Sequence, residues 1–507
     1  MTSVVVGGLF NAVAFAGAGY LFSKLNHSGY EGEMKRHNKA LGKLAKAKEK
    51  WYESQVEKKN RIAILRQELV DAKSDMETTN RALDSLRKAQ EELTLDREPT
   101  IHDYYKPSSE MEEYQQITIG ILGLGSGFVH IADPDKIPAK LLKNCASSIY
   151  LSLCDLFNKS LSLGKLPNEW KLSNIVPIPK KGPAEDVSNY RPISLLSLVS
   201  KVFERCVYNQ LVSHIFTQLH HLQFGFLRGK STTSQLLHVL QDIHQALESR
   251  NQVDAVYLDF AKAFDKVSHK LLLTKLHKFG VRGDLLSWFE NYLSGCYQRV
   301  TVLGETSGTL PVLSGVPQGS ILGPLLFLVY VNDLPHSISG ESTVAMFADD
   351  TKCYRPVKDL PNCESLQNDL NNLVNWCTIW KMDLNKSKCR VMSFTRSRQP
   401  VTTNYKLLDS SLRQLCHQKD LGIVVTKDLK WTKQVEEITS KASSMLGFIR
   451  RTASDTHNIH VRKVLYLSLV RSKLGYASQN KYTTRTILEH LSLCASNATQ
   501  LGLLIVY

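Results

Sequence analysis

The sequence predicts a mixed α+β fold, in which one large globular unit follows a hydrophobic helix and a long helix of coiled-coil type. Three observations lead to this prediction. Residues 4–22 form an apolar run, residues 43–98 contain neither Gly nor Pro, and short apolar strands alternate with amphipathic helices from residue 133 to about residue 480. Because 43% of the 507 residues are hydrophobic and 22% are charged, the chain can bury a sizeable core, which excludes a fibrous or wholly disordered protein.

Residues 1–25 are predicted to form a transmembrane helix. In the run from Val4 to Phe22 the one plainly polar side chain is Asn11, and the run is just long enough to cross a hydrocarbon layer of ~30 Å as a helix. The cations that follow, Lys24, Lys35 and Arg36, would keep the rest of the chain in the cytoplasm. A buried helix rich in Gly and Ala explains the same run, so the chain is membrane-anchored only if residues 4–22 insert.

Residues 30–98 are predicted to form a coiled coil. The segment is dense in Lys, Glu, Ala, Leu and Gln, which is the composition of a long helix. Apolar side chains recur at heptad positions: Ile62, Leu65, Leu69, Ala72, Met76, Leu83, Leu86 and Leu93. Such a seam favours self-association, and a single solvated helix is the alternative. Pro99 ends the helix, so residues 99–132 are predicted to be a linker or junction.

The charge of the chain predicts a polyanionic partner. Lys and Arg number 63 against 48 Asp and Glu, a formal net charge of +15. Nucleic acid is the first partner that such a surplus favours, and an anionic membrane is the second. The ten cysteines form no CxxC pair, which argues against a zinc ribbon or a secreted disulfide scaffold and favours a reducing compartment.

Two predicted strands end in aspartate. The first reads Ala255-Val-Tyr-Leu-Asp259, and the second runs from Thr343 to the adjacent pair Asp349 and Asp350. Since successive strand residues point to opposite faces, adjacent aspartates can meet at one site only if the chain turns there. The sequence therefore predicts a tight hairpin at Asp349 and Asp350.

Three carboxylates at one site need a counterion. Two like charges about 4 Å apart repel each other by roughly 4 kcal/mol at an effective dielectric constant near 20. Divalent cations relieve this repulsion, and oxygen ligands without His or Cys select Mg²⁺ or Mn²⁺ over zinc. Two such ions would stabilise the attacking and leaving oxygens of an in-line phosphoryl displacement.

Four motifs surround these aspartates. They are Asn189-Tyr-Arg-Pro-Ile-Ser-Leu-Leu196, Leu258-Asp-Phe-Ala-Lys-Ala-Phe-Asp265, Ser314-Gly-Val-Pro-Gln-Gly-Ser-Ile-Leu-Gly-Pro324 and Phe347-Ala-Asp-Asp350. In this order and spacing they resemble the reverse transcriptase of non-LTR retrotransposons of the LINE type, close to the jockey and chicken-repeat groups. The resemblance extends from about residue 133 to residue 478.

The resemblance implies a right-hand polymerase that copies RNA into DNA. Residues 133–425 would form its fingers and palm, and residues 426–507 a partial thumb with a divergent C-terminal tail. Its partners would be an RNA template, a DNA primer and deoxynucleoside triphosphates, its cofactors two Mg²⁺ or Mn²⁺ ions, and its location the nucleus or the cytoplasm. Basic helices through 441–451 and 462–473 would follow the duplex backbone.

The resemblance also implies roles for individual residues. Asp259, Asp349 and Asp350 would be the catalytic metal ligands, and Lys388 would donate a proton to pyrophosphate. Phe260 would exclude a 2′-hydroxyl group as a steric gate, with a core aromatic as the alternative. The other substrate-binding residues would be Arg191 and Lys180 at the triphosphate, Gln318 and Gly319 around the base pair, and Phe347 and Ala348 beside the aspartates. The segment 420–431 would support the primer end.

The chain also departs from this family. Residues 1–132 contain nothing like the endonuclease that precedes the polymerase in full-length elements, and the sequence after Ser478 lacks the usual continuation of the thumb. A shortened thumb is therefore expected. Two alternatives follow: a catalytically inactive remnant fused to a membrane-anchored coiled-coil protein, and an RNA-synthesising polymerase that shares the palm.

Overall fold

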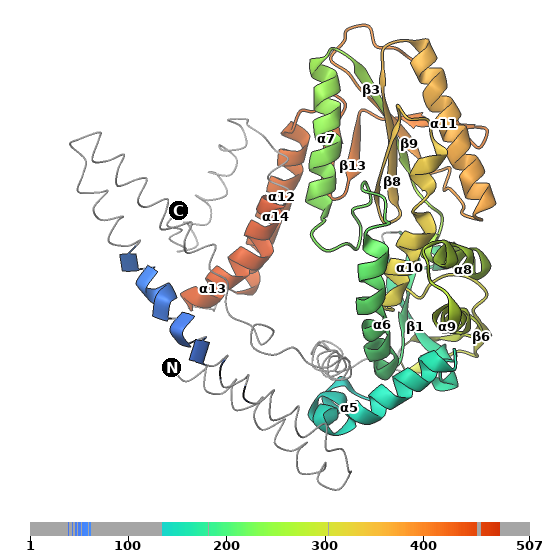
Figure 1. Cartoon of the computed structure of the whole chain (residues 1–507). Helices are drawn as coiled ribbons and strands as arrows, with labels where there is room; N and C mark the ends of the chain where they lie inside the picture. The colour runs from blue at the N-terminus through green and yellow to red at the C-terminus, as the bar shows by residue number, and fades with distance from the viewer. Residues whose placement is uncertain are drawn as a thin grey trace. The chain divides into compact units, whose positions relative to one another are not determined.

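The computed structural model describes residues 134–476, apart from 181, 303 and 454–457, and some of residues 39–61 (Figure 1). Contacts divide the chain into two compact units, one of Met1–Val129 with Pro138–Phe157 and one of His130–Ile137 with Asn158–Tyr507. Helix α5 (Ala139–Ser162) therefore belongs mostly to the first unit. The elements from residue 163 onward belong to the second.

A five-stranded sheet lies at the centre of the second unit, in the order β12-β9-β3-β8-β7. Its strands are β3 (Gln252–Leu258), β7 (Thr343–Phe347), β8 (Asp350–Val357), β9 (Arg390–Phe394) and β12 (Arg413–Gln414). The middle strand β3 runs antiparallel to both β8 and β9. It is buried on both faces, which explains why its sequence is a nearly continuous apolar run instead of an alternating one.

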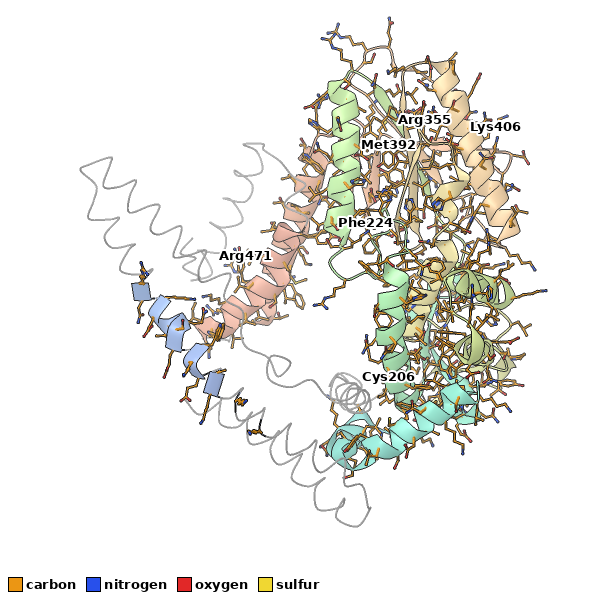
Figure 2. The ribbon with its side chains drawn as sticks, viewed as in Figure 1. Cys206, Phe224, Arg355, Met392, Lys406 and Arg471 are labelled. Carbon is orange, nitrogen blue, oxygen red and sulfur yellow. The ribbon has the colours of Figure 1, made fainter. Side chains whose placement is uncertain are left out.

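Helices cover the two faces of this sheet (Figure 1). One face packs against α7 (Thr232–Glu248) and the hairpin of β13 (His417–Asp420) and β14 (Ile423–Thr426). The shared core includes Leu236 of α7 and Met392 of β9, of which Met392 is labelled in Figure 2. The other face packs against α11 (Leu360–Ile379), which begins at the capping side chain of Asp359.

A second sheet combines strands from before and after β3 in the chain. It contains β1 (Leu172–Pro179), β2 (Tyr190–Leu195), β4 (Tyr297–Val302), β5 (Glu305–Thr306) and β6 (Leu310–Pro311). Strand β1 is antiparallel to β2 and parallel to β4. Beside it, four helices pack against one another: α6 (Leu198–Phe216), α8 (His269–Lys278), α9 (Gly283–Leu293) and α10 (Leu322–Val331). Phe203 of α6 and Trp288 of α9 contact each other edge to face.

The C-terminal part that the structure describes is helical. It consists of α12 (Thr432–Thr452), α13 (Ile459–Leu465), a π-helical turn (Tyr466–Arg471) and α14 (Ser472–Gly475). These helices share a small core around Ala442 and Val470. A short hairpin of β10 (Lys406–Leu407) and β11 (Ser410–Ser411) and four 3₁₀ turns complete the described elements; the turns are Asn168–Lys171, Val187–Asn189, Ala263–Lys266 and Leu334–Ser337.

The mixed α+β prediction is confirmed for the described residues. The predicted transmembrane run 4–22, the heptad positions from Ile62 to Leu93 and the linker 99–132 lie outside the described part of the chain. Those positions between 39 and 61 that the structure describes are helical. Within the described part, none of the helices combines the length and apolar character that a membrane crossing needs.

Candidate functional site

Strands β7 and β8 form the predicted hairpin. Phe347 pairs with Asp350, so Ala348 and Asp349 are the two turn residues. The turn lies one residue earlier than the sequence predicted, because Asp350 already belongs to β8. Ala348 has φ +56°, a backbone conformation that favours glycine, as two-residue hairpin turns require.

Strand β3 brings Asp259 to the same end of the sheet. Leu258, the last residue of β3, pairs with Thr351, so Asp259, which follows the strand, lies beside Asp350. The backbone of Asp259 is fixed from its other side, because the N–H group of Asn385 donates to its carbonyl at 2.7 Å. The structure thus brings together the three aspartates that the sequence singled out.

The pKa values of these carboxyl groups reflect their proximity. Burial, then the charge of Asp349, raises the pKa of Asp350 to about 6, with smaller contributions from Asp420 and Asp259. Burial also raises the pKa of Asp349, and the charge of Asp259 adds to this, whereas Arg191 acts in the opposite direction. In the absence of a cation, the folded chain therefore disfavours full ionisation of the pair.

The donor set suits a hard divalent cation. Asp259, Asp349 and Asp350 offer carboxylate oxygens, which Mg²⁺ and Mn²⁺ prefer. In the described part of the chain, no three His, Cys, Asp or Glu side chains already form a metal-binding group, so these carboxylates would have to turn towards a shared ion. Asp259 forms an ion pair with Lys388, whose Nζ lies 3.5 Å from its Oδ2.

The two cations predicted in the fingers lie on neighbouring strands. Arg191 is exposed on β2, and its charge acts on Asp349, so it reaches the neighbourhood of the aspartates. Lys180 follows β1 and is also exposed, but its Nζ lies 3.4 Å from the carbonyl oxygen of Ser188. The structure therefore connects Arg191 with the site, while the contact given for Lys180 is local.

The loop with Gln318 and Gly319 packs against β2. The N–H group of Ser194 donates to the carbonyl oxygen of Gln318 at 2.7 Å, and Nε2 of Gln318 donates to Asp265 at 3.0 Å. Gly319 has φ +131°, and a Cβ atom there would lie 2.4 Å from the carbonyl oxygen of Ser194. The close approach of two backbones thus requires glycine at this position.

Replacing Gly319 by Ala is expected to destabilise the fold by about 1–3 kcal/mol, because it adds backbone strain and a clash with β2. Urea denaturation of the intact chain measures this effect. Gly340 is the matched control, since a Cβ atom there meets nothing within 4 Å, and its replacement by Ala should change stability by less than about 0.5 kcal/mol. Equal stability of the two variants would contradict the packing role of Gly319.

Phe260 and Lys388 lie on either side of Asp259. Phe260 is only 6% exposed, and its backbone bridges to Leu384. This burial is compatible with both a gate and a core aromatic. Lys388 is 65% exposed and faces Asp259, whereas Nζ of Lys386 donates to the carbonyl oxygen of Leu408 at 3.1 Å. Of these two lysines, Lys388 is thus the one beside the aspartates.

A cavity of about 340 Å³ opens beside Asp259 and Asp350. Lys388 and Arg390 also line it. The β13–β14 hairpin also lines it, through Gln418, Lys419, Asp420 and Leu421.

A buried ion pair under this cavity was not predicted from the sequence. Lys352 of β8 is 2% exposed, and its Nζ lies 2.6 Å from Oδ1 of Asp420, which is 7% exposed. Gln235 of α7 accepts a further hydrogen bond from Lys352 at 3.0 Å. The pair joins the strand of Asp350 to the hairpin. The available signal was a lysine in the interior of a strand, next to Cys353 and Tyr354, since a buried cation needs a buried acid.

Comparisons with known proteins were consistent with one another. The family model described as "Reverse transcriptase (RNA-dependent DNA polymerase)" matches residues 178–449. Three similar proteins come from Drosophila melanogaster. The "probable RNA-directed DNA polymerase from transposon X-element" is 33% identical over 58% of this chain, that of "transposon BS" is 31% identical over 68%, and the "RNA-directed DNA polymerase from mobile element jockey" is 32% identical over 56%. The matches cover 33%, 40% and 32% of those proteins, so this chain spans less than half of their length.

Proposed function

Because this chain belongs to the reverse transcriptase (RNA-dependent DNA polymerase) family, we propose that it extends the 3′-hydroxyl group of a primer on an RNA template with deoxynucleoside triphosphates. The observation that carries the proposal is the proximity of Asp259 to Asp349 and Asp350 at one end of the central sheet. Residues 133–425 would be the fingers and palm, and residues 426–507 the partial thumb.

The three aspartates would hold two Mg²⁺ or Mn²⁺ ions. When bound, these ions lower the pKa of the attacking hydroxyl group and neutralise charge on the leaving pyrophosphate. The raised pKa values of Asp349 and Asp350 support this role, because a cation removes the repulsion that disfavours their ionised forms. Metal affinity is therefore expected to fall as the pH drops below about 6.

Two cationic side chains would contact the triphosphate. Arg191, whose charge lowers the pKa of Asp349, would bind two phosphate oxygens at once through its planar guanidinium group. Lys388 holds a proton on Nζ beside Asp259 and can transfer it to the departing pyrophosphate. Lys180, Gln318, Gly319, Phe347 and Ala348 would shape the rest of the pocket.

The cavity between the aspartates and the β13–β14 hairpin would hold the primer end. Its hairpin wall carries the amide of Gln418 and the ammonium group of Lys419, which can contact a sugar–phosphate backbone. Helices α12 and α13 carry further cations at their C-terminal ends, Arg450, Arg451, Arg462 and Lys463. These would bind the duplex through phosphate contacts, which weaken as salt concentration rises.

Primer extension on a defined RNA template tests the proposal. The intact chain is expected to incorporate deoxynucleotides with Mg²⁺ or Mn²⁺, and EDTA should abolish incorporation. Absence of incorporation under all metal conditions, together with retained RNA binding, would contradict the proposal and favour a catalytically inactive remnant.

Replacing Phe260 by Val is expected to raise the use of ribonucleotides relative to deoxyribonucleotides by about 10-fold or more, since a smaller side chain no longer excludes the 2′-hydroxyl group. Single-nucleotide incorporation assays with matched nucleotides measure the ratio. Phe264 is the control. It lies in the same segment as Phe260 and stacks on Phe327 of α10, and its replacement by Leu should leave the ratio unchanged. An unchanged ratio for the Phe260 variant would favour an RNA-synthesising polymerase.

A further inference from the structure

The segment Leu222–Lys230, here called the 222–230 loop, lies along the free side of β7. The N–H group of Phe224 donates to the carbonyl oxygen of Met346 at 2.9 Å, and the N–H group of Met346 donates to Leu222 at 3.0 Å. Figure 2 shows Phe224 towards the end of the sheet that carries the aspartates, whereas Arg355 lies towards the other end. The loop is thus a neighbour of the β7–β8 turn.

Gln223 connects this loop to the turn through a buried side chain. It is 1% exposed, and its Oε1 accepts from the N–H groups of Ala348 at 2.9 Å and Gly225 at 2.8 Å. Its Nε2 atom is buried and has no hydrogen-bond partner among the described residues. Among the described residues, the side chain of Gln223 therefore forms its hydrogen bonds through Oε1, which accepts from both N–H groups.

The turn needs such support. Ala348 adopts φ +56°, a conformation that an alanine occupies only when its surroundings enforce it. The loop approaches so closely that a Cβ atom at Gly225 would lie 2.4 Å from the nitrogen of Ala348. A rotation of the turn would break the hydrogen bond to Gln223 and change the directions of Asp349 and Asp350, which follow Ala348 in the chain.

The loop also touches the segment that follows Asp259. Phe226 packs edge-on against Phe264, with ring centroids 6.1 Å apart. Nζ of Lys230 donates to the carbonyl oxygen of Gln223 at 2.8 Å, which closes the loop on itself. The 222–230 loop therefore contacts both the β7–β8 turn and the segment that follows Asp259.

We propose that Gln223 is a positioning residue, which holds the turn of Ala348 and Asp349 in its left-handed conformation and so sets the geometry of the metal-binding carboxylates. This inference rests on the proposed function in one respect, namely that Asp349 and Asp350 bind the metal ions. Gln223 itself contacts neither metal nor substrate.

The test compares Gln223→Met, Ala348→Gly and the double variant in the intact chain. Methionine has a similar volume but offers no acceptor to the two N–H groups. Glycine at position 348 adopts a positive φ without support, so it should rescue the first change. The readouts are hydrogen exchange of the turn amides in the metal-free chain, and Mn²⁺ affinity measured by electron paramagnetic resonance.

Gln223→Met is expected to speed exchange at the turn and to weaken Mn²⁺ binding by about 10- to 100-fold, the range found when partners of metal ligands are removed. The double variant should recover most of the affinity. Unchanged affinity in Gln223→Met, or no recovery in the double variant, would overturn the inference.

A matched control separates positioning from general stability. Gln434 of α12 is also 1% exposed, its Oε1 accepts from the N–H group of Val424 at 2.8 Å, and its Nε2 has no partner among the described residues. Gln434→Met should lower stability and leave Mn²⁺ affinity unchanged; an equal loss of affinity there would count against Gln223. If the unaltered chain bound Mn²⁺ no better than Asp349→Ala, the proposed function would fail, and exchange at the turn would still decide the role of Gln223.

Discussion

Replacing Asp349 by Ala is expected to lower the rate of primer extension by more than about 100-fold. Even residues that only orient metal ligands change activity by about 10- to 100-fold, and Asp349 would be a ligand itself. The fold should survive the change. Because the pKa of Asp349 is raised by burial and by Asp259, its ionised form disfavours folding at neutral pH, so its removal should leave stability of the metal-free chain unchanged or higher.

The measurement pairs primer extension with thermal unfolding in EDTA. Asp284 is the matched control, since it is an exposed aspartate in the first turn of α9, outside the site. Asp284→Ala should extend primers as the unaltered chain does. Equal extension by Asp349→Ala and the unaltered chain would remove the proposed site.

Replacing Lys352 by Met is expected to destabilise the chain by about 3–5 kcal/mol, because it leaves the charge of Asp420 buried without its partner. Urea denaturation followed by circular dichroism measures the loss. The double variant Lys352→Met with Asp420→Leu should recover most of it, since two apolar side chains replace the ion pair without an uncompensated charge.

A surface pair provides the comparison. Lys430 and Asp428 lie 3.3 Å apart, and the side chain of Lys430 is 77% exposed. Lys430→Met should therefore cost at most about 1 kcal/mol. A similar cost for Lys352→Met would show that the ion pair beneath the cavity contributes no more than a solvent-exposed one.

The sequence predicted the arrangement of the aspartates because successive residues of a strand point to opposite faces, which limits how adjacent acids can meet. Two adjacent acids can converge only at a turn, and the structure has that turn, displaced by one residue. The displacement was not predictable from alternation alone, since it depends on which residue of the loop can take a positive φ. Alanine is a poor candidate for that position, and the reason it is tolerated lies in Gln223, 125 residues earlier in the chain.

The ion pair and the loop contacts could not be derived in the same way. β8 is buried along nearly all its length, yet contains Lys352 and Arg355, which a period of two places on opposite faces, so alternation alone cannot turn both towards solvent. Their partners Asp420 and Asp369 come from other elements, and the pairing depends on tertiary packing. The predicted substrate residues came from the family resemblance. The match to the family model confirms the family, and the roles of these residues stay predictions.

The pairing of residues 222–224 with β7 has a consequence for solubility. Strand β7 is an edge strand of the central sheet. If residues 222–224 did not pair with it, its N–H and C=O groups could bind a strand of another molecule. Changes that detach the segment would then promote intermolecular association as well as loss of activity. Variants there should be compared at low protein concentration, where a chemical defect persists and aggregation does not.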